Sequence, residues 1–187
     1  MKNLIPKKLT VGALALMLAA SMPVAAFASN IDVAGGTGSA TVNLDVEAPT
    51  FSVTVPTALP INVSADGEVT TAQDAKIVNN SHGSVIVTNV TVTGKNDWKV
   101  VEADKDMSGV KVNAKEFGMT INGDKTAAEG NLIFSQDNWT AIGAKDDAGD
   151  TDELAITYDA VVAPQANNMD GIEVASIVFT VGWNTTA

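Results

Sequence analysis

Residues Ser84–Thr93 read SVIVTNVTVT, a run in which almost every residue is β-branched. A branched Cβ restricts the side chain and suits the pleated surface of a sheet. Polar and apolar residues also tend to alternate along the run, as expected for a strand with one buried face. The run therefore predicts a long β-strand, and one that would promote aggregation if it were exposed.

Similar runs fill most of the chain on either side of this one. The segment Ala40–Val46 alternates strictly, because Ala, Val, Leu and Val occupy every second position. Turns rich in Asn, Asp and Gly separate the runs, and only Thr70–Ala75 and Thr126–Glu129 suit a helical turn. The other expected strands are Phe51–Val55, Leu59–Val63, Trp98–Glu102, Phe117–Ile121, Leu132–Phe134, Leu154–Val162 and Ile172–Trp183. About nine short strands without crossover helices predict an all-β fold, an antiparallel β-sandwich or jelly roll.

The first 28 residues have the order of parts of a secretory signal peptide. A start with three lysines and no acid precedes an apolar core at Leu9–Ala20, which is too short to span a bilayer. The small-x-small pattern at Ala26–Ala28 suits a signal peptidase, so we expect cleavage between Ala28 and Ser29. A Gly-rich, flexible arm is expected at Ser29–Ser39, and a single β-sandwich domain at 40–187. The protein is therefore expected to be secreted and associated with the cell surface.

Composition excludes several classes of function. The chain of 187 residues has no cysteine and one histidine, and its 11 basic residues, all lysine, face 22 acidic ones. These counts exclude a disulfide scaffold, a cysteine zinc site and a multi-histidine metal centre. They also argue against nucleic acid as a partner. The mature chain contains no second long apolar segment, so no membrane span is expected.

Few residues qualify as catalytic or metal-binding. His82 follows Ser81 in a turn-like stretch without a nucleophile-elbow motif, and an ordinary turn histidine is the better interpretation. A secreted hydrolase with a carboxylate pair is a third-ranked hypothesis, because acidic residues are abundant. We expect no catalytic residue and no cofactor. The acidic loop Asp146–Glu153 is a weak candidate for Ca²⁺, set against a solvated loop.

The tryptophans are the candidates for ligand binding. Trp98 and Trp139 both follow polar turns, and Trp183 closes the last strand. An exposed indole stacks on sugar rings, which makes Trp98 and Trp139 weak candidates for a glycan site. The alternative, favoured for each residue, is that the indole fills the core or one end of the sandwich.

From Phe51 to Ala103 the order of parts resembles the wall-associated WxL domain of Gram-positive bacteria. The resemblance rests on Val55-Pro56, on the polar stretch Asn80–Gly83 and on Trp98-Lys99-Val100, with Phe179-Thr180-Val181 near the end. That resemblance implies non-covalent attachment to cell-wall glycan. The chain departs from both W-x-L motifs, since Val100 replaces Leu, and Phe179 and Val181 replace Trp and Leu.

The layout is equally similar to camelysin/TasA-type biofilm-matrix proteins. The resemblance implies an exported, cysteine-free jelly roll whose N-terminal strand completes a sheet of the next subunit. In this chain the arm Ser29–Ser39 followed by Ala40–Val46 would supply that strand, in the manner of β-augmentation. The favoured hypothesis is a non-enzymatic matrix or fibre component whose partner is itself, and the alternative is a module that binds cell-wall glycan.

Overall fold

The computed structural model describes residues 34–36, 40, 42, 44–128 and 130–186. The chain divides into two units, Met1–Val46 and Glu47–Ala187. The described residues form twelve strands and one 3-10 helix, η1 (Gln136–Asn138), and they contain no α-helix. The all-β prediction is therefore confirmed. The expected signal peptide, its cleavage between Ala28 and Ser29, and most of the expected arm lie outside the described residues.

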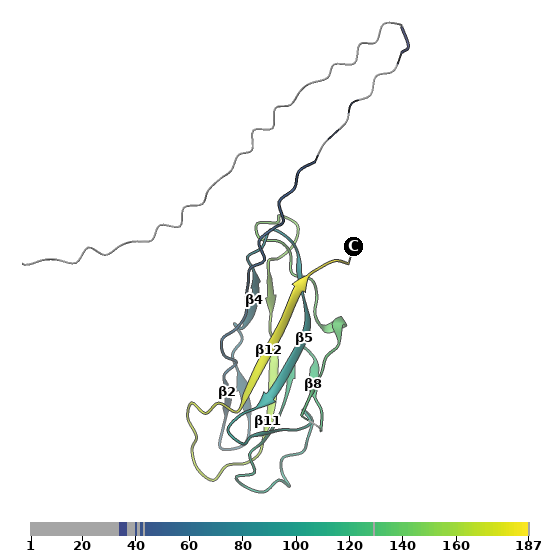
Figure 1. The fold of residues 1–187 in the computed structure, drawn as a ribbon. Coiled ribbons are helices and arrows are strands. Elements are labelled where there is room, and N and C mark those ends of the chain that lie inside the picture. The colour runs from purple at the N-terminus through teal and green to yellow at the C-terminus, as the bar shows by residue number, and fades with distance from the viewer. Residues whose placement is uncertain (1–33, 37–39, 41, 43, 129, 187) are drawn as a thin grey trace, which may run out of the picture. The chain divides into compact units, whose positions relative to one another are not determined.

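Among the described residues, the two longest strands form a two-stranded sheet with each other. Strand β5 (Val85–Gly94) runs antiparallel to β12 (Ala175–Trp183), from Gly94 opposite Ala175 to Val85 opposite Trp183. They lie side by side in Figure 1. Thr88 is an extra residue in β5, because Val87 pairs with Val181 and Asn89 with Thr180. This bulge shifts the alternation by one position, so that Asn89 stays exposed while Val87 and Val90 are buried.

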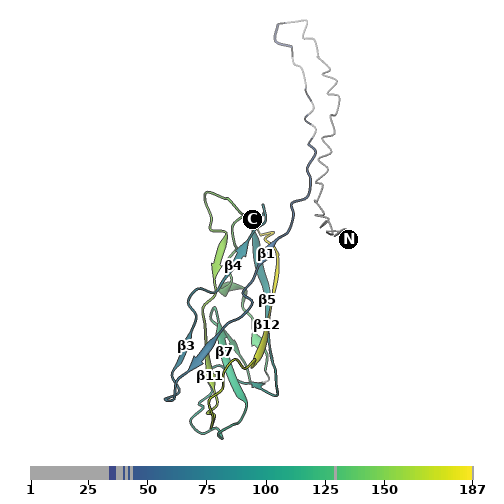
Figure 2. The same cartoon turned by 90° about the vertical axis from the view of Figure 1, so that its left-hand side faces the viewer.

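A second sheet has the strand order β11-β7-β8-β9. Its strands are β7 (Glu116–Ile121), β8 (Asp124–Thr126), β9 (Leu132–Ile133) and β11 (Tyr158–Val162). The turn between β7 and β8 is Asn122-Gly123, with φ of 47° and 92°, as a tight hairpin turn requires. The short strand β6 (Lys99–Val100) pairs with β7 in the parallel sense. Strands β7 and β11 are adjacent in Figure 2.

Two smaller antiparallel sheets complete the fold. One has the order β1-β4-β10, formed by β1 (Val53–Thr54), β4 (Lys76–Asn79) and β10 (Glu153–Ala155). The other pairs β2 (Ile61–Val63) with β3 (Val69–Thr71). The core is formed by buried side chains from β4, β5, β7 and β11 and from adjoining loops, among them Ile77, Phe117, Met119, Ile121, Trp139 and Ile142. Burying each large apolar side chain contributes about 1.5–3 kcal/mol relative to leaving it in water.

Several sequence-based boundaries need correction. Leu154–Val162 alternates as one run but forms two strands, because the backbone leaves β4 and joins β7 at Ile156 and Thr157. There Ile156 N–H donates to Ala75 O, and Thr157 N–H donates to the Asn122 side chain. Of the two segments that suited a helical turn, Thr70–Ala75 begins with two residues of β3. Thr126–Glu129 begins with the last residue of β8, and Glu129 lies outside the described residues. The described residues of Ala40–Val46 form no strand.

Candidate functional site

The segment Ala40–Val46 exposes apolar side chains in alternation. Val42, Leu44 and Val46 are 91%, 86% and 70% exposed, and no strand is assigned to them. In an extended conformation these three residues share one face, since strand side chains alternate. Scattered single apolar residues are normal on a surface, but a contiguous apolar face often marks an interaction site. This segment is the feature that a partner could cover.

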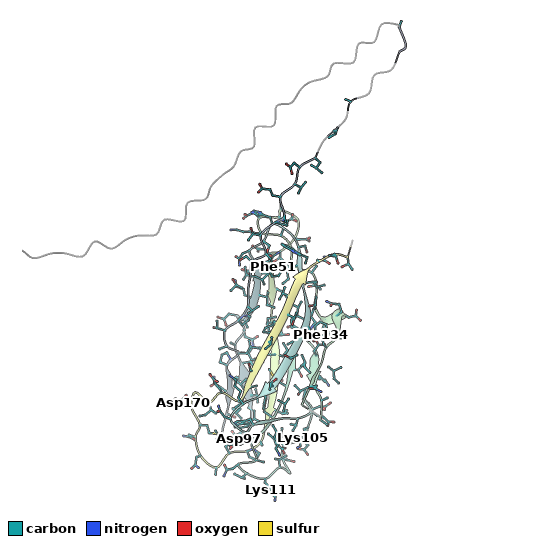
Figure 3. All side chains as sticks on the ribbon, viewed as in Figure 1. Phe51, Asp97, Lys105, Lys111, Phe134 and Asp170 are labelled. Atoms are coloured by element: carbon teal, nitrogen blue, oxygen red, sulfur yellow. The ribbon has the colours of Figure 1, made fainter. Side chains whose placement is uncertain are left out.

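Phe51, a few residues after this segment, packs against the end of β12. The Phe51 ring lies edge-on to the Trp183 ring, with centroids 5.0 Å apart and an interplanar angle of 90°. Figure 3 labels Phe51 at the end of the β-domain where β12 terminates. Gly83 packs against the same indole, because a Cβ there would lie 2.9 Å from the Trp183 ring. Phe51 and Trp183 are still 44% and 36% exposed, so this end of β12 keeps an apolar surface.

A buried polar network holds the chain beside Phe51. Ser52 N–H donates to Ser81 Oγ at 2.8 Å, and Ser81 Oγ donates to Ser52 O at 3.1 Å. Asn79 holds this turn, since its Nδ2 donates to Gly83 O and Gly143 O and its Oδ1 accepts from Ser81 N–H. Asn79 and Ser81 are 0% and 1% exposed. The polar stretch singled out in the sequence therefore holds Ser52 against the turn at Ser81.

The structure places both candidate ligand tryptophans in the core. Trp98 is 6% exposed and lies edge-on to Phe117, while Trp139 is 1% exposed and packs against Phe134 and Phe179. Neither indole presents an open face to solvent, and their packing is that of core residues. Glycan stacking by either residue stays a prediction.

A buried carboxylate is the polar centre that sequence reasoning missed. Asp124 is 2% exposed and accepts hydrogen bonds from Ser135 N–H, Asn138 Nδ2 and Trp139 Nε1 at 3.1, 2.6 and 2.7 Å. These bonds tie β8 to η1 and orient the Trp139 indole. In the sequence Asp124 follows Asn-Gly and looks like any turn acid, so only the three-dimensional contacts reveal it. Because all three hydrogen-bond donors belong to this chain, the Asp124 carboxylate has a structural role.

The remaining polar candidates do not converge. His82 is exposed in its turn, and the described residues contain no group of three or more His, Asp or Glu side chains placed to hold a metal ion. Calcium binding at Asp146–Glu153 stays a prediction. Asp106 accepts from Ser108 N–H at 2.9 Å, and this bond lowers the pKa of its carboxyl below the ordinary value. The Asp106 carboxylate therefore accepts a hydrogen bond within its own turn.

No family model, no curated protein and no solved structure matches the chain.

Proposed function

We propose that this protein is a non-enzymatic, exported structural protein that assembles into fibres or a surface matrix. In this proposal the domain is a β-sandwich, and the segment Ala40–Val46 of one subunit adds a strand to the next. The observation that carries the proposal is the exposure of Val42, Leu44 and Val46 together with their strict alternation. A segment with β-strand patterning whose described residues belong to no strand is suited to supply a strand to another subunit.

The energetics favour a partner with an open sheet edge. Burying each exposed aliphatic side chain contributes about 1.5–3 kcal/mol, and an added strand also satisfies backbone N–H and C=O groups. A solvated segment gains neither term. Ordering the segment costs conformational entropy, so the apolar side chains and the backbone must both contribute.

The charge of the mature chain favours self-association over attachment to an anionic polymer of the wall. Removal of residues 1–28 takes three lysines and leaves eight against 22 acidic residues, a formal charge of −14. A surface of that charge repels anionic polymers unless a cation bridges them. Copies of the chain also repel one another, but the apolar contacts and backbone hydrogen bonds of a donated strand would offset that repulsion.

Electron microscopy of the mature protein, residues 29–187, tests the proposal. We expect fibres or ladders in negative stain, and we expect them to be lost when residues 29–47 are deleted. Because the deletion removes only residues outside the described strands, the truncated domain should keep its β-sheet circular dichroism. A full mature chain that stays monomeric at high concentration would refute the proposal. Fractionation of the producing cell should place the polymer in the surface fraction.

A further inference from the structure

We propose that the outer edge of β12 is the acceptor for the donated strand. This inference rests on the proposed function and identifies the surface to which Ala40–Val46 of a second copy binds. Each copy of the chain would then carry one donor segment, Ala40–Val46, and one acceptor edge, that of β12.

The edge of β12 is long and carries no protective charge or proline, and the bulge of this pair, at Thr88, belongs to β5. Among the described residues β12 pairs only with β5, and its sequence Ala175–Trp183 (ASIVFTVGW) contains neither a charged residue nor a proline. Natural proteins normally protect such edges with charge, proline, a bulge or short length. Among the other described strands, β1, β2, β3, β6, β9 and β10 are only two or three residues long, and β11 carries Asp159.

The hydrogen-bond pattern shows which residues of β12 are available. Lys95 N–H donates to Val174 O, and Asn184 N–H donates to Ser84 O, at the two ends of the β5–β12 pair. By the alternation of an antiparallel ladder, the residues of β12 that exchange bonds with β5 are Ser176, Val178, Thr180 and Gly182. The residues between them direct their backbone groups to the outer edge. These are Ile177, Phe179 and Val181, and in the described part of the chain no other backbone group bonds to them.

The side chains of the same three residues extend the core. Ile177, Phe179 and Val181 are half-buried and pack against the core, and the Phe179 ring lies 6.1 Å from that of Trp139. A strand added beside β12 with Val42, Leu44 and Val46 facing inward would continue this apolar face. Its polar residues would lie beside the outward-facing Val178 and Thr180. The seven-residue donor fits within the nine residues of the edge.

The other edge of the pair is a poorer acceptor. On β5, Val85 exchanges both backbone bonds with Ile142, and Val87 O accepts from Gln136 Nε2 at 3.1 Å. Beyond them a hollow of about 420 Å³ separates Asn89–Thr93 from Asn131 and Leu132. An inserted strand needs about 9.6 Å between its two neighbours, twice the strand spacing. Cα atoms of β5 and β9 lie within 8 Å of each other, so the hollow is too narrow.

Cross-linking between fibre subunits tests the acceptor, because the chain has no cysteine of its own. Asp45→Cys is the donor variant. Ser176→Cys, Val178→Cys and Thr180→Cys are acceptor variants that together cover the possible registers. Thr91→Cys is the matched control, since Thr91 pairs directly with Val178 but lies one strand further from the edge. Each acceptor thiol is first converted to its mixed disulfide with thionitrobenzoate.

After donor and acceptor are mixed under fibre-forming conditions, the thiolate of the donor variant attacks the mixed disulfide, forms the new disulfide and releases thionitrobenzoate. A disulfide requires Cα atoms about 4.4–6.8 Å apart, which adjacent strands provide and next-but-one strands do not. We expect at least one β12 variant to be linked about tenfold faster than Thr91→Cys.

The outcomes separate this inference from the proposed function. Two results would contradict β12 as the acceptor while still supporting self-assembly. In the first, fibres form and Thr91→Cys is linked as fast as every β12 variant. In the second, fibres form and no β12 variant is linked. An Asp45→Cys/Val178→Cys double variant that closes its disulfide within a monomer would overturn the intermolecular arrangement. Absence of fibres and of links in all mixtures would refute both proposals.

Discussion

The indole Nε1 of Trp139 donates a hydrogen bond of 2.7 Å to Oδ2 of Asp124, and both residues are buried. The second oxygen of the carboxylate accepts from Asn138 and from Ser135 N–H. The bonds join a three-residue strand to the 3-10 helix and hold the indole against Phe179 of β12. A turn acid and a turn tryptophan of the sequence thus form one unit that packs against β12.

Replacing Asp124 with Ala should lower the free energy of unfolding by about 2–3 kcal/mol, because the buried Trp139 N–H loses its acceptor. Asp137→Ala is the matched control, since Asp137 is an exposed acid in η1. It should change the value by less than about 0.5 kcal/mol. Urea denaturation of both variants measures the difference. Equal stabilities would mean that the carboxylate does not support the indole.

Trp98→Ala and Trp139→Ala should each cost about 3–5 kcal/mol of stability, because both rings are buried in the core. Trp183→Ala should cost less, since that ring remains 36% exposed. Thermal denaturation gives the ranking, and sedimentation with purified peptidoglycan tests the glycan hypothesis on the same samples. A Trp98→Ala protein that keeps its melting temperature but loses peptidoglycan binding would contradict the core assignment and support a glycan site.

Gly118→Ala should destabilise the fold by about 1–3 kcal/mol, the usual cost of overpacking. A Cβ at Gly118 would collide with Glu102 O, and backbone rather than a flexible side chain would have to move. Gly109→Ala provides the control, because a Cβ at Gly109 would have no neighbouring atom within 4 Å. Calorimetry of both should show a lower melting temperature only for the first. A neutral Gly118→Ala would mean that the β7 backbone shifts away easily.

The elements that local patterning defines were predicted well. Ser84–Thr93 matches β5 to within one residue at each end, and the predicted end of Ile172–Trp183 is the end of β12. Its predicted start lies three residues too early. Both strands could be recognised because β-branched alternation is a local property. The bulge at Thr88 depends on the partner strand, and the change of sheet at Ile156 depends on Ala75 and Asn122. Contacts between distant residues determine both features, so a single sequence does not reveal them.

The features of the candidate site likewise fall into those that local sequence patterning predicts and those that depend on distant contacts. Alternation marked Ala40–Val46 as a strand suited for donation, and the exposure of its apolar residues agrees with that use. The open edge of β12 was not predictable, since pairing on one side only is a property of the assembled sheets. Asp124 was missed for the same reason. Tryptophans after polar turns suggested a surface, but packing against Phe117 and Phe134 places the rings in the core.

Polymer formation should increase with ionic strength. At −14 the subunits repel one another at low salt, and the Debye length falls from about 10 Å at 0.1 M to about 3 Å at 1 M. Light scattering at fixed protein concentration should therefore rise as NaCl is added. A decrease with salt would indicate that charge pairs, and not an apolar strand, hold the subunits together.

The most direct test of the central claim compares two faces of the donated segment. Val42→Asp/Leu44→Asp and Thr41→Asp/Asn43→Asp add the same charge to the same segment of residues 29–187, the first pair on the apolar face and the second on the polar one. Sedimentation velocity measures the polymer fraction of each. We expect the first variant to be monomeric and the second to polymerise to at least half the extent of the parent. Equal polymer fractions in the two variants would contradict assembly through this strand.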